Sequence, residues 1–171
     1  MTQILLMRGL NESASEDLSM SDLHSLLLVL GAGSMVSLMK NGNVVCAHDV
    51  DAHELAHSVQ TACGLFPMII ALSRDAWHER VSDNPFDGAP PKCVQAFFRG
   101  SDEVVDTGEM ETYAGRGEDI IATPGMIWLY AEKGAAKSKL IKRIDDLSDT
   151  PLIIRSLHML NQINRHVGDP A

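Results

Sequence analysis

Two histidines and a glutamate stand at the spacing of a zinc motif. The segment His53-Glu54-Leu55-Ala56-His57 is a literal H-E-x-x-H, which on a helix places two imidazoles one turn apart with a glutamate as general base. Glu79, further along the chain, is the candidate third ligand. The apolar side chains of the predicted helix share one arc, however, and both histidines lie off its centre. We therefore predict no metal centre and two solvated histidines, His53 and His57, that bind metal only adventitiously; a zinc-dependent hydrolase is a remote alternative.

Two lysines indicate a different chemistry, the binding of an anion. Lys137 and Lys139 follow Gly134 and stand in the first turns of a helix that is predicted to begin near Ala135. A helix N-terminus attracts anions and disfavours cations, so an anion held between the N–H groups and the lysines would explain this placement. The alternative is a pair of solubility residues on an exposed turn. A Walker phosphate loop is excluded, because that motif needs glycines at positions 131 and 136, where alanine stands.

Polar residues at predicted strand ends and turns complete the candidate ligand site. The structural alternative is that Asn43 satisfies the backbone of a turn, while Arg8 and Arg155 pair with some of the acidic residues. The predicted ligand is a small anion, such as a nucleotide or a phosphorylated metabolite. The predicted ligand-binding residues are Arg8, Asn11, Asn43, Lys137, Lys139 and Arg155.

The composition is that of a globular protein with an acidic balance. The 171 residues include 14 Lys and Arg against 23 Asp and Glu, which gives a formal net charge of −9. So negative a chain repels phosphate backbones, which argues against nucleic acid or an anionic membrane as a partner of the whole molecule. No apolar run approaches the ~18 residues that would span a bilayer, and the first residues lack the pattern of a signal peptide. Three widely spaced cysteines, Cys46, Cys63 and Cys93, fit reduced buried thiols, so we expect a cytoplasmic protein.

Periodicity predicts the element order strand, helix, strand, strand, helix, strand in the first half, followed by a trailing helix. Ser19 caps a helix with a leucine stripe, and Asp51 caps a second helix that ends at Gly64. The pair Asn41-Gly42 is a strong hairpin signal, because both residues tolerate positive φ. Ser73 begins the trailing helix. The predicted strands are residues 4–7, 35–39, 43–47 and 67–72.

The second half repeats this order. Gly42 and Gly125 are 83 residues apart, and Pro67 and Pro151 are 84 apart, which suggests a duplication. We predict an α+β protein of two ferredoxin-like (βαββαβ) halves, residues 1–83 and 92–171, which form one compact unit with the ligand in a cleft between them. The predicted elements are strands over 94–98, 119–123, 126–131 and 151–155, a weak helix over 102–107, a helix with an apolar stripe over 140–147 and a trailing helix over 157–163.

Six short motifs occur in order along nearly the whole chain. They are Leu6-Met7-Arg8-Gly9-Leu10-Asn11, the helix over 20–30, Asn41-Gly42-Asn43-Val44-Val45, Asn84-Pro85-Phe86, Trp128-Leu129-Tyr130 with Lys137-Ser138-Lys139-Leu140, and Ile154-Arg155-Ser156. In these motifs the chain resembles a bacterial family known as domain of unknown function 1697. The loop after the first motif departs from the family, because a glycine-bearing, partly basic loop is here the acidic segment 12–17. The resemblance implies a fold, but no activity and no cofactor.

The sequence leaves open whether the protein is an enzyme, and its cofactor is unknown. The alternative to a ligand-binding protein is a protein-interaction module without catalysis. In that case an exposed sheet face or edge pairs with a partner or with a second copy of the chain, as unpaired strand edges readily do.

Overall fold

The chain forms two compact units. A computed structural model describes residues 2–10, 18–38 and 42–168. Unit 1 comprises Met1–His78 and Gln162–Ala171, and unit 2 comprises Glu79–Asn161. Unit 2 is therefore one continuous stretch that is inserted between the two stretches of unit 1.

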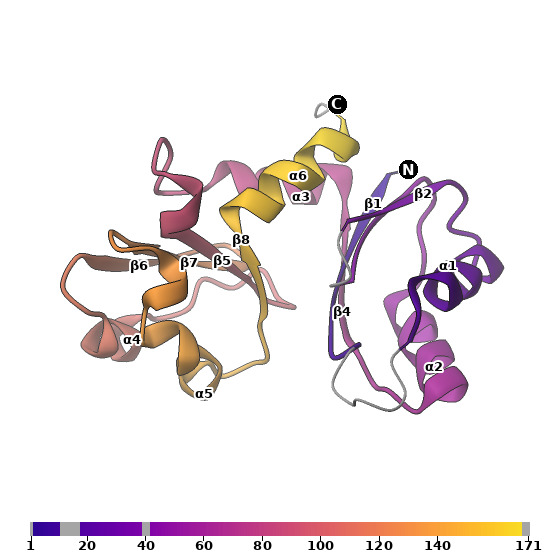
Figure 1. The fold of residues 1–171 in the computed structure, drawn as a ribbon, viewed down its shortest axis with the longest axis horizontal. Coiled ribbons are helices and arrows are strands. Elements are labelled where there is room, and N and C mark those ends of the chain that lie inside the picture. Colours follow the sequence, from indigo (N-terminus) through magenta and orange to yellow (C-terminus); the bar gives the residue numbers. More distant parts are fainter. Residues whose placement is uncertain (1, 11–17, 39–41, 169–171) are drawn as a thin grey trace. The chain divides into compact units, whose positions relative to one another are not determined.

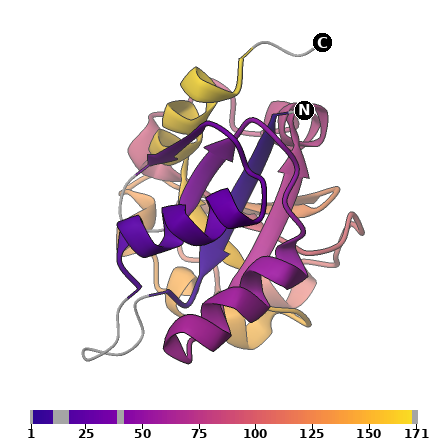
Figure 2. The same ribbon diagram turned by 90° about the vertical axis from the view of Figure 1, so that its right-hand side faces the viewer.

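Unit 1 contains a four-stranded antiparallel sheet with strand order β2-β3-β1-β4. Two helices lie side by side across one face of this sheet, as Figure 2 shows. The strands are β1 (Gln3–Arg8), β2 (Met35–Leu38), β3 (Asn43–Cys46) and β4 (Met68–Ser73), and the helices are α1 (Met20–Val29) and α2 (Ala52–Cys63).

Both helices of unit 1 begin at the predicted caps. The Ser19 hydroxyl accepts a hydrogen bond from the backbone N–H of Asp22 at 3.1 Å. The Asp51 carboxylate accepts from the backbone N–H groups of His53 and Glu54 at 2.8 and 2.9 Å. Such caps satisfy donors that the first turn of a helix leaves without an intrahelical partner. The structure confirms both predicted helices.

The core of unit 1 lies between the sheet and these helices. Side chains alternate across β1, so Leu5 and Met7 point into the core together with Cys46 of β3. Burial, with a contribution from the charge of Asp49, raises the pKa of the Cys46 thiol to about 11. The thiol therefore stays protonated at neutral pH and acts as a small apolar side chain. The helices contribute Leu23, Leu27, Leu55 and Val59.

Unit 2 contains a second four-stranded antiparallel sheet with the corresponding strand order, β6-β7-β5-β8. Two short helices lie on one face of it (Figure 1), and its core includes Phe97, Ile127, Leu129, Leu140 and Ile144. The protein is thus α+β, with two four-stranded sheets that are compatible with two similar halves. The elements are β5 (Val94–Phe98), β6 (Glu118–Thr123), β7 (Met126–Ala131), β8 (Ile153–Ser156), α4 (Gly108–Tyr113) and α5 (Ile144–Leu147).

A helix follows the last strand of each sheet, α3 (Arg74–Ser82) after β4 and α6 (Leu157–Val167) after β8. The hydroxyl of the serine that ends each strand accepts a hydrogen bond from the first helical turn at 3.2 Å, Ser73 from the N–H of Ala76 and Ser156 from that of Met159. Among the described residues, none of the helices combines the length and the apolar character that a membrane crossing requires.

The boundaries between the two units fall inside α3 and α6 rather than in loops. Trp77, near the end of the first stretch of unit 1, is fully buried. Its indole Nε1–H donates to the side-chain oxygen of Asn164, in the second stretch of unit 1, at 2.6 Å. This hydrogen bond joins the two stretches that make up unit 1.

Two helix predictions in unit 2 are wrong. Residues 102–107 are not helical, and α4 begins only at Gly108, whose N–H donates to the Asp106 carboxylate at 2.8 Å. The helix predicted from near Ala135 is instead two 3-10 turns, η2 (Ala135–Lys137) and η3 (Leu140–Lys142), followed by α5. Ser138 interrupts it, because its backbone is extended (ψ 133°) and its buried hydroxyl accepts the N–H of Leu140 at 3.1 Å. The buried, hydrogen-bonded Ser138 therefore interrupts the predicted helix.

Candidate functional site

The structure places two of the predicted ligand residues together at one end of the sheet of unit 1. Asn43 pairs with Leu6 across the β1–β3 ladder, and Arg8 lies two residues further along β1 on the same face. Asn43 is fully buried, and its side-chain amide donates to the carbonyl of Leu38 at 3.1 Å. That bond closes the β2–β3 connection, as the structural alternative for Asn43 requires. Arg8 is exposed, and Asn11 lies outside the described residues.

The two predicted lysines lie in unit 2, on the segment that joins β7 to α5. Lys137 and Lys139 are both exposed, whereas Ser138 between them is buried. Ala135 and Leu140, on either side, are also buried, so the segment is anchored and projects its two ammonium groups outward. Because η2 has only three residues, the dipole of a long helix contributes nothing at this position.

Arg155 lies on β8, on the face of the second sheet opposite α4 and α5. It pairs with Ala96 of β5, whose partner on β7 is Trp128, so its neighbours along this row of the sheet are apolar. Its Nη1–H donates to the carbonyl of Ile154 at 2.8 Å. Burial lowers the pKa of the Arg155 guanidinium to about 10, because removal of water disfavours the charged form. The group is still charged at neutral pH.

The five predicted residues that the structure describes divide between the two units. Arg8 and Asn43 belong to unit 1, whereas Lys137, Lys139 and Arg155 belong to unit 2. Within unit 2, η2 packs against the end of β7 and against the 3-10 turn before β5, η1 (Pro91–Cys93). Since β8 ends opposite the beginning of β5, Arg155 and the lysine segment occupy the same end of this sheet.

Both histidines of the H-E-x-x-H segment are exposed on α2. Within residues 2–10, 18–38 and 42–168, no three side chains of the metal-binding types come together in a cluster that could hold a metal ion. The backbone N–H of His53 donates to Asp51, which shows that the segment serves as the first turns of a capped helix.

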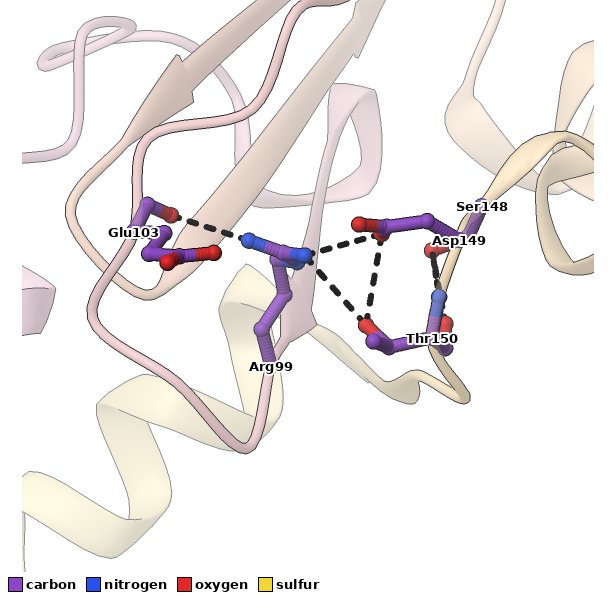
Figure 3. A network of polar contacts seen from close by, with 5 residues as sticks. All are labelled: Arg99, Glu103, Ser148, Asp149 and Thr150. Carbon is purple, nitrogen blue, oxygen red and sulfur yellow. Dashed lines mark hydrogen bonds and ion pairs between the residues drawn. The ribbon is translucent and has the colours of Figure 1, made fainter.

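Sequence reasoning missed a buried arginine network at the end of β5. Arg99 is only 1% exposed and holds two loops that are distant in sequence, as Figure 3 shows. One terminal nitrogen donates to the carbonyl of Glu103 at 2.9 Å. The other donates to the Asp149 carboxylate at 2.8 Å and to the Thr150 hydroxyl at 3.4 Å. The Nε–H of Arg99 is buried and has no hydrogen-bond partner among the described residues.

Arg99 occupies the position in unit 2 that Met7 occupies in unit 1. The backbone N–H of Met7 donates to the carbonyl of Gly42, and that of Arg99 donates to the carbonyl of Gly125. Met7 belongs to the apolar core beneath α1. In unit 2 a charged side chain fills the equivalent place, and its hydrogen bonds fix the non-helical segment after β5. No signal in the sequence indicated this burial, because Arg99-Gly100 resembles Arg8-Gly9 but is offset from it by one residue in the strand register.

A second buried arginine supports the same segment. Arg80 donates to the carbonyl of Arg99 at 3.1 Å and to the Asp102 carboxylate at 2.6 Å. Its guanidinium also lies against the β6–β7 turn, where a Cβ on Gly125 would come within 2.7 Å of Cζ. Arg80 and Arg99 therefore hold residues 99–103 in place without any helical hydrogen bond.

A cavity of about 310 Å³ opens at the end of the first sheet. Its lining comes from the start of β1, the residue after β3, the end of β4 and the first turn of α3. These lining residues are Thr2, Ala47, Ser73, Arg74 and Asp75, all of which belong to unit 1.

Comparison with protein families gives a match over most of the chain. The family described as "Protein of unknown function (DUF1697)" matches residues 1–128. The chain belongs to this family. The matched part contains all four strands of unit 1 as well as β5 and β6 of unit 2. The resemblance seen in the sequence motifs is thereby confirmed for DUF1697.

The fold of this DUF1697 member also occurs in a solved structure. The conserved bacterial protein SP0830 from Streptococcus pneumoniae is similar over 98% of each chain, with a TM-score of 0.67 and 17% sequence identity. At that identity the likeness establishes the fold alone. A search of curated proteins found no match. Neither the description of DUF1697 nor that of SP0830 states an activity.

Proposed function

We propose that this DUF1697 protein binds a small anionic ligand, of the class of nucleotides and phosphorylated metabolites, through Arg155 of unit 2. The observation that supports this most is the guanidinium of Arg155 on an apolar row of the sheet, with its pKa lowered by burial. A positive charge with less hydration interacts more strongly with an anion than a fully solvated one does. The planar guanidinium also matches the paired oxygens of phosphate and carboxylate groups.

Lys137 and Lys139 are the further cationic residues of this proposal. They lie at the same end of the sheet as Arg155, on a segment that the buried Ser138 and Leu140 anchor. Exposed ammonium groups add charge and raise the association rate more than they add directional bonds. Arg8 and Asn43 remain candidates in unit 1, but the amide of Asn43 is already used in the β2–β3 connection. Unit 2 is therefore the place to test first.

We also propose that both units are ferredoxin-like and arose by duplication, with halves at residues 1–83 and 92–171. The matching strand orders, β2-β3-β1-β4 and β6-β7-β5-β8, support this origin. So do the two serines, Ser73 and Ser156, that cap the following helix at equivalent strand ends.

Ligand binding through Arg155 predicts a melting temperature that rises with phosphate, nucleotides or phosphorylated sugars in a thermal-shift screen. The rise should disappear in Arg155→Gln. It should persist weakly in Arg155→Lys, which keeps the charge but loses the paired N–H donors of the guanidinium. Affinity should fall about tenfold in the double variant Lys137→Ala/Lys139→Ala, as loss of favourable charge pairs predicts. Arg116→Gln, which removes one exposed charge ahead of β6, serves as the matched control and should bind normally.

Each shift is to be measured against the same variant without ligand, so that a change in intrinsic stability does not enter. A flat response of the wild-type protein across phosphate, nucleotides and carboxylates would contradict the proposal. An equal response of wild type and Arg155→Gln would contradict it as well.

The second candidate function is a protein-interaction module, and the sheet edges favour it. Among the described residues, β2 and β6 each have a strand neighbour on one side only. Each carries an exposed apolar side chain, Val36 with 41% and Ile121 with 39% exposure. Unpaired edges with apolar side chains are templates for strand addition.

An interaction through these edges predicts self-association of the purified chain in light scattering. Ile121→Lys or Val36→Lys should return it to the monomer, because a charge on an edge strand opposes strand addition. Val104→Lys is the matched control, since Val104 is also an exposed valine but lies outside both sheets. A wild-type chain that stays monomeric at all concentrations, with no change in any variant, would rule out self-pairing.

A further inference from the structure

The cavity at the end of the first sheet has features of a second binding site, independent of Arg155. Its volume of about 310 Å³ lies at the lower end of the range typical of ligand cavities, roughly 300–1,000 Å³. That size suits a small metabolite better than a nucleotide. Its walls come from three strand ends and one helix, so the lining is built by the sheet rather than by one loop.

The lining offers both charges and two hydroxyl groups. Arg74 and Asp75 supply one positive and one negative group, so the formal charges of the described lining residues cancel. The Thr2 hydroxyl has no hydrogen-bond partner within the described part of the chain. The Ser73 hydroxyl accepts from the N–H of Ala76 at 3.2 Å, and its own O–H is left to donate. Apolar atoms make up the larger part of the lining surface, and the methyl group of Ala47 contributes to it.

The pairing of the two charges is loose. The Arg74 Nε lies 3.5 Å from the nearest Asp75 oxygen, longer than a good charge-assisted hydrogen bond. The Asp75 side chain is 72% exposed, and ion pairs of this kind contribute little to stability. Because the contact uses Nε, the terminal nitrogens of Arg74 can still donate to an incoming carboxylate. Little is lost when a ligand replaces this contact with pairings of its own.

We propose that this cavity binds a small zwitterion of the free α-amino acid class. The ligand carboxylate accepts from the guanidinium of Arg74, the ligand ammonium donates to the Asp75 carboxylate, and the Thr2 and Ser73 hydroxyls contact polar atoms of the ligand. A lone anion satisfies Arg74 but approaches Asp75 unfavourably, and a lone cation does the reverse. A zwitterion is the class that pairs with both charges. The limited volume favours a short side chain, as in glycine, alanine or serine.

The test is a calorimetric titration of the full chain with the common L-amino acids. We expect saturable binding of a small amino acid, and no binding of its N-acetyl or methyl ester derivative, which each lack one charge. Binding should weaken about tenfold or more in Arg74→Gln and in Asp75→Asn, the scale of losing one charged hydrogen bond. Arg116→Gln and Asp119→Asn, exposed charges outside the cavity, are the matched controls and should bind as the wild type does.

The derivative series uses the wild-type protein, so the outcome does not depend on the folding of any variant. The proposal is overturned if no amino acid binds, if the derivatives bind equally well, or if Arg74→Gln and Asp75→Asn leave the affinity unchanged. Binding of phosphate alone that is lost in Arg74→Gln would likewise replace the zwitterion with a simple anion. None of these outcomes bears on Arg155, which has its own variants.

Discussion

Arg99→Ala is expected to lower the free energy of unfolding by about 3–5 kcal/mol, the range of a large buried side chain removed together with its hydrogen bonds. Arg99 is among the largest fully buried side chains, and it ties Glu103 to Asp149 and Thr150. Its removal leaves a cavity under the segment after β5 and releases two loops at once. Urea unfolding followed by circular dichroism measures the loss.

The companion variant Arg99→Met separates packing from charge. Methionine has nearly the length of arginine and stands at the equivalent position, Met7, in unit 1. Because the Asp149 side chain is 67% exposed, its carboxylate can be rehydrated when the guanidinium is gone. We expect Arg99→Met to cost only about 1 kcal/mol, since an apolar side chain of similar volume often replaces a buried ion pair at little cost. An equal loss in both variants would show that the hydrogen bonds, and not the packing, stabilise the segment.

Gly125→Ala is expected to destabilise the protein by about 2–4 kcal/mol, from backbone strain and steric displacement together. Gly125 has a φ of +69°, which disfavours any residue with a Cβ. The new Cβ would also lie 2.7 Å from Cζ and Nε of Arg80, so it would push aside the guanidinium that holds Arg99 and Asp102. Thermal or urea unfolding of the variant measures the sum of the two effects.

Gly88→Ala is the control that isolates the backbone cost. Gly88 has a similar φ of +79°, but a Cβ there meets nothing within 4 Å. It should therefore cost only about 1–2 kcal/mol. In an Arg80→Ala background the extra cost of Gly125→Ala should vanish, because the clashing group is absent. If Gly88→Ala and Gly125→Ala are equally destabilising, the steric contact with Arg80 contributes nothing to the loss of stability in Gly125→Ala.

The parts of the fold that the sequence predicted are those determined by neighbouring residues. Ser19 and Asp51 cap their helices through bonds to residues two or three positions away, and the hairpin of unit 1 follows from the glycine turn at Gly42. Of the two helix predictions that failed, only the one over 102–107 involves a partner distant in sequence: Arg80 binds Asp102, while Arg99 binds the carbonyl of Glu103. The helix near Ala135 fails for a local reason, the bond between the Ser138 hydroxyl and the N–H of Leu140.

The sequence also predicted only part of the candidate site. Lys137 and Lys139 are exposed, as lysines on a polar turn are expected to be. The helix that was predicted around them is absent, because the buried Ser138 interrupts it. The burial of Arg99 could not be predicted from its own surroundings in the sequence. An arginine before a glycine at a strand end is ordinarily solvated, and its acidic partner Asp149 lies 50 residues further on.

The insertion of unit 2 between the two stretches of unit 1 has a consequence for the order of events during synthesis. Residues 79–161 are made as an uninterrupted block that contains every strand of its own sheet. The earlier block, by contrast, lacks one of its partners until residue 164 has been translated, since the Trp77 indole donates to Asn164. The part of the protein that is made first is thus the last to be completed, and a nonsense mutation just before Gln162 would leave its tryptophan without that hydrogen bond while sparing the later block.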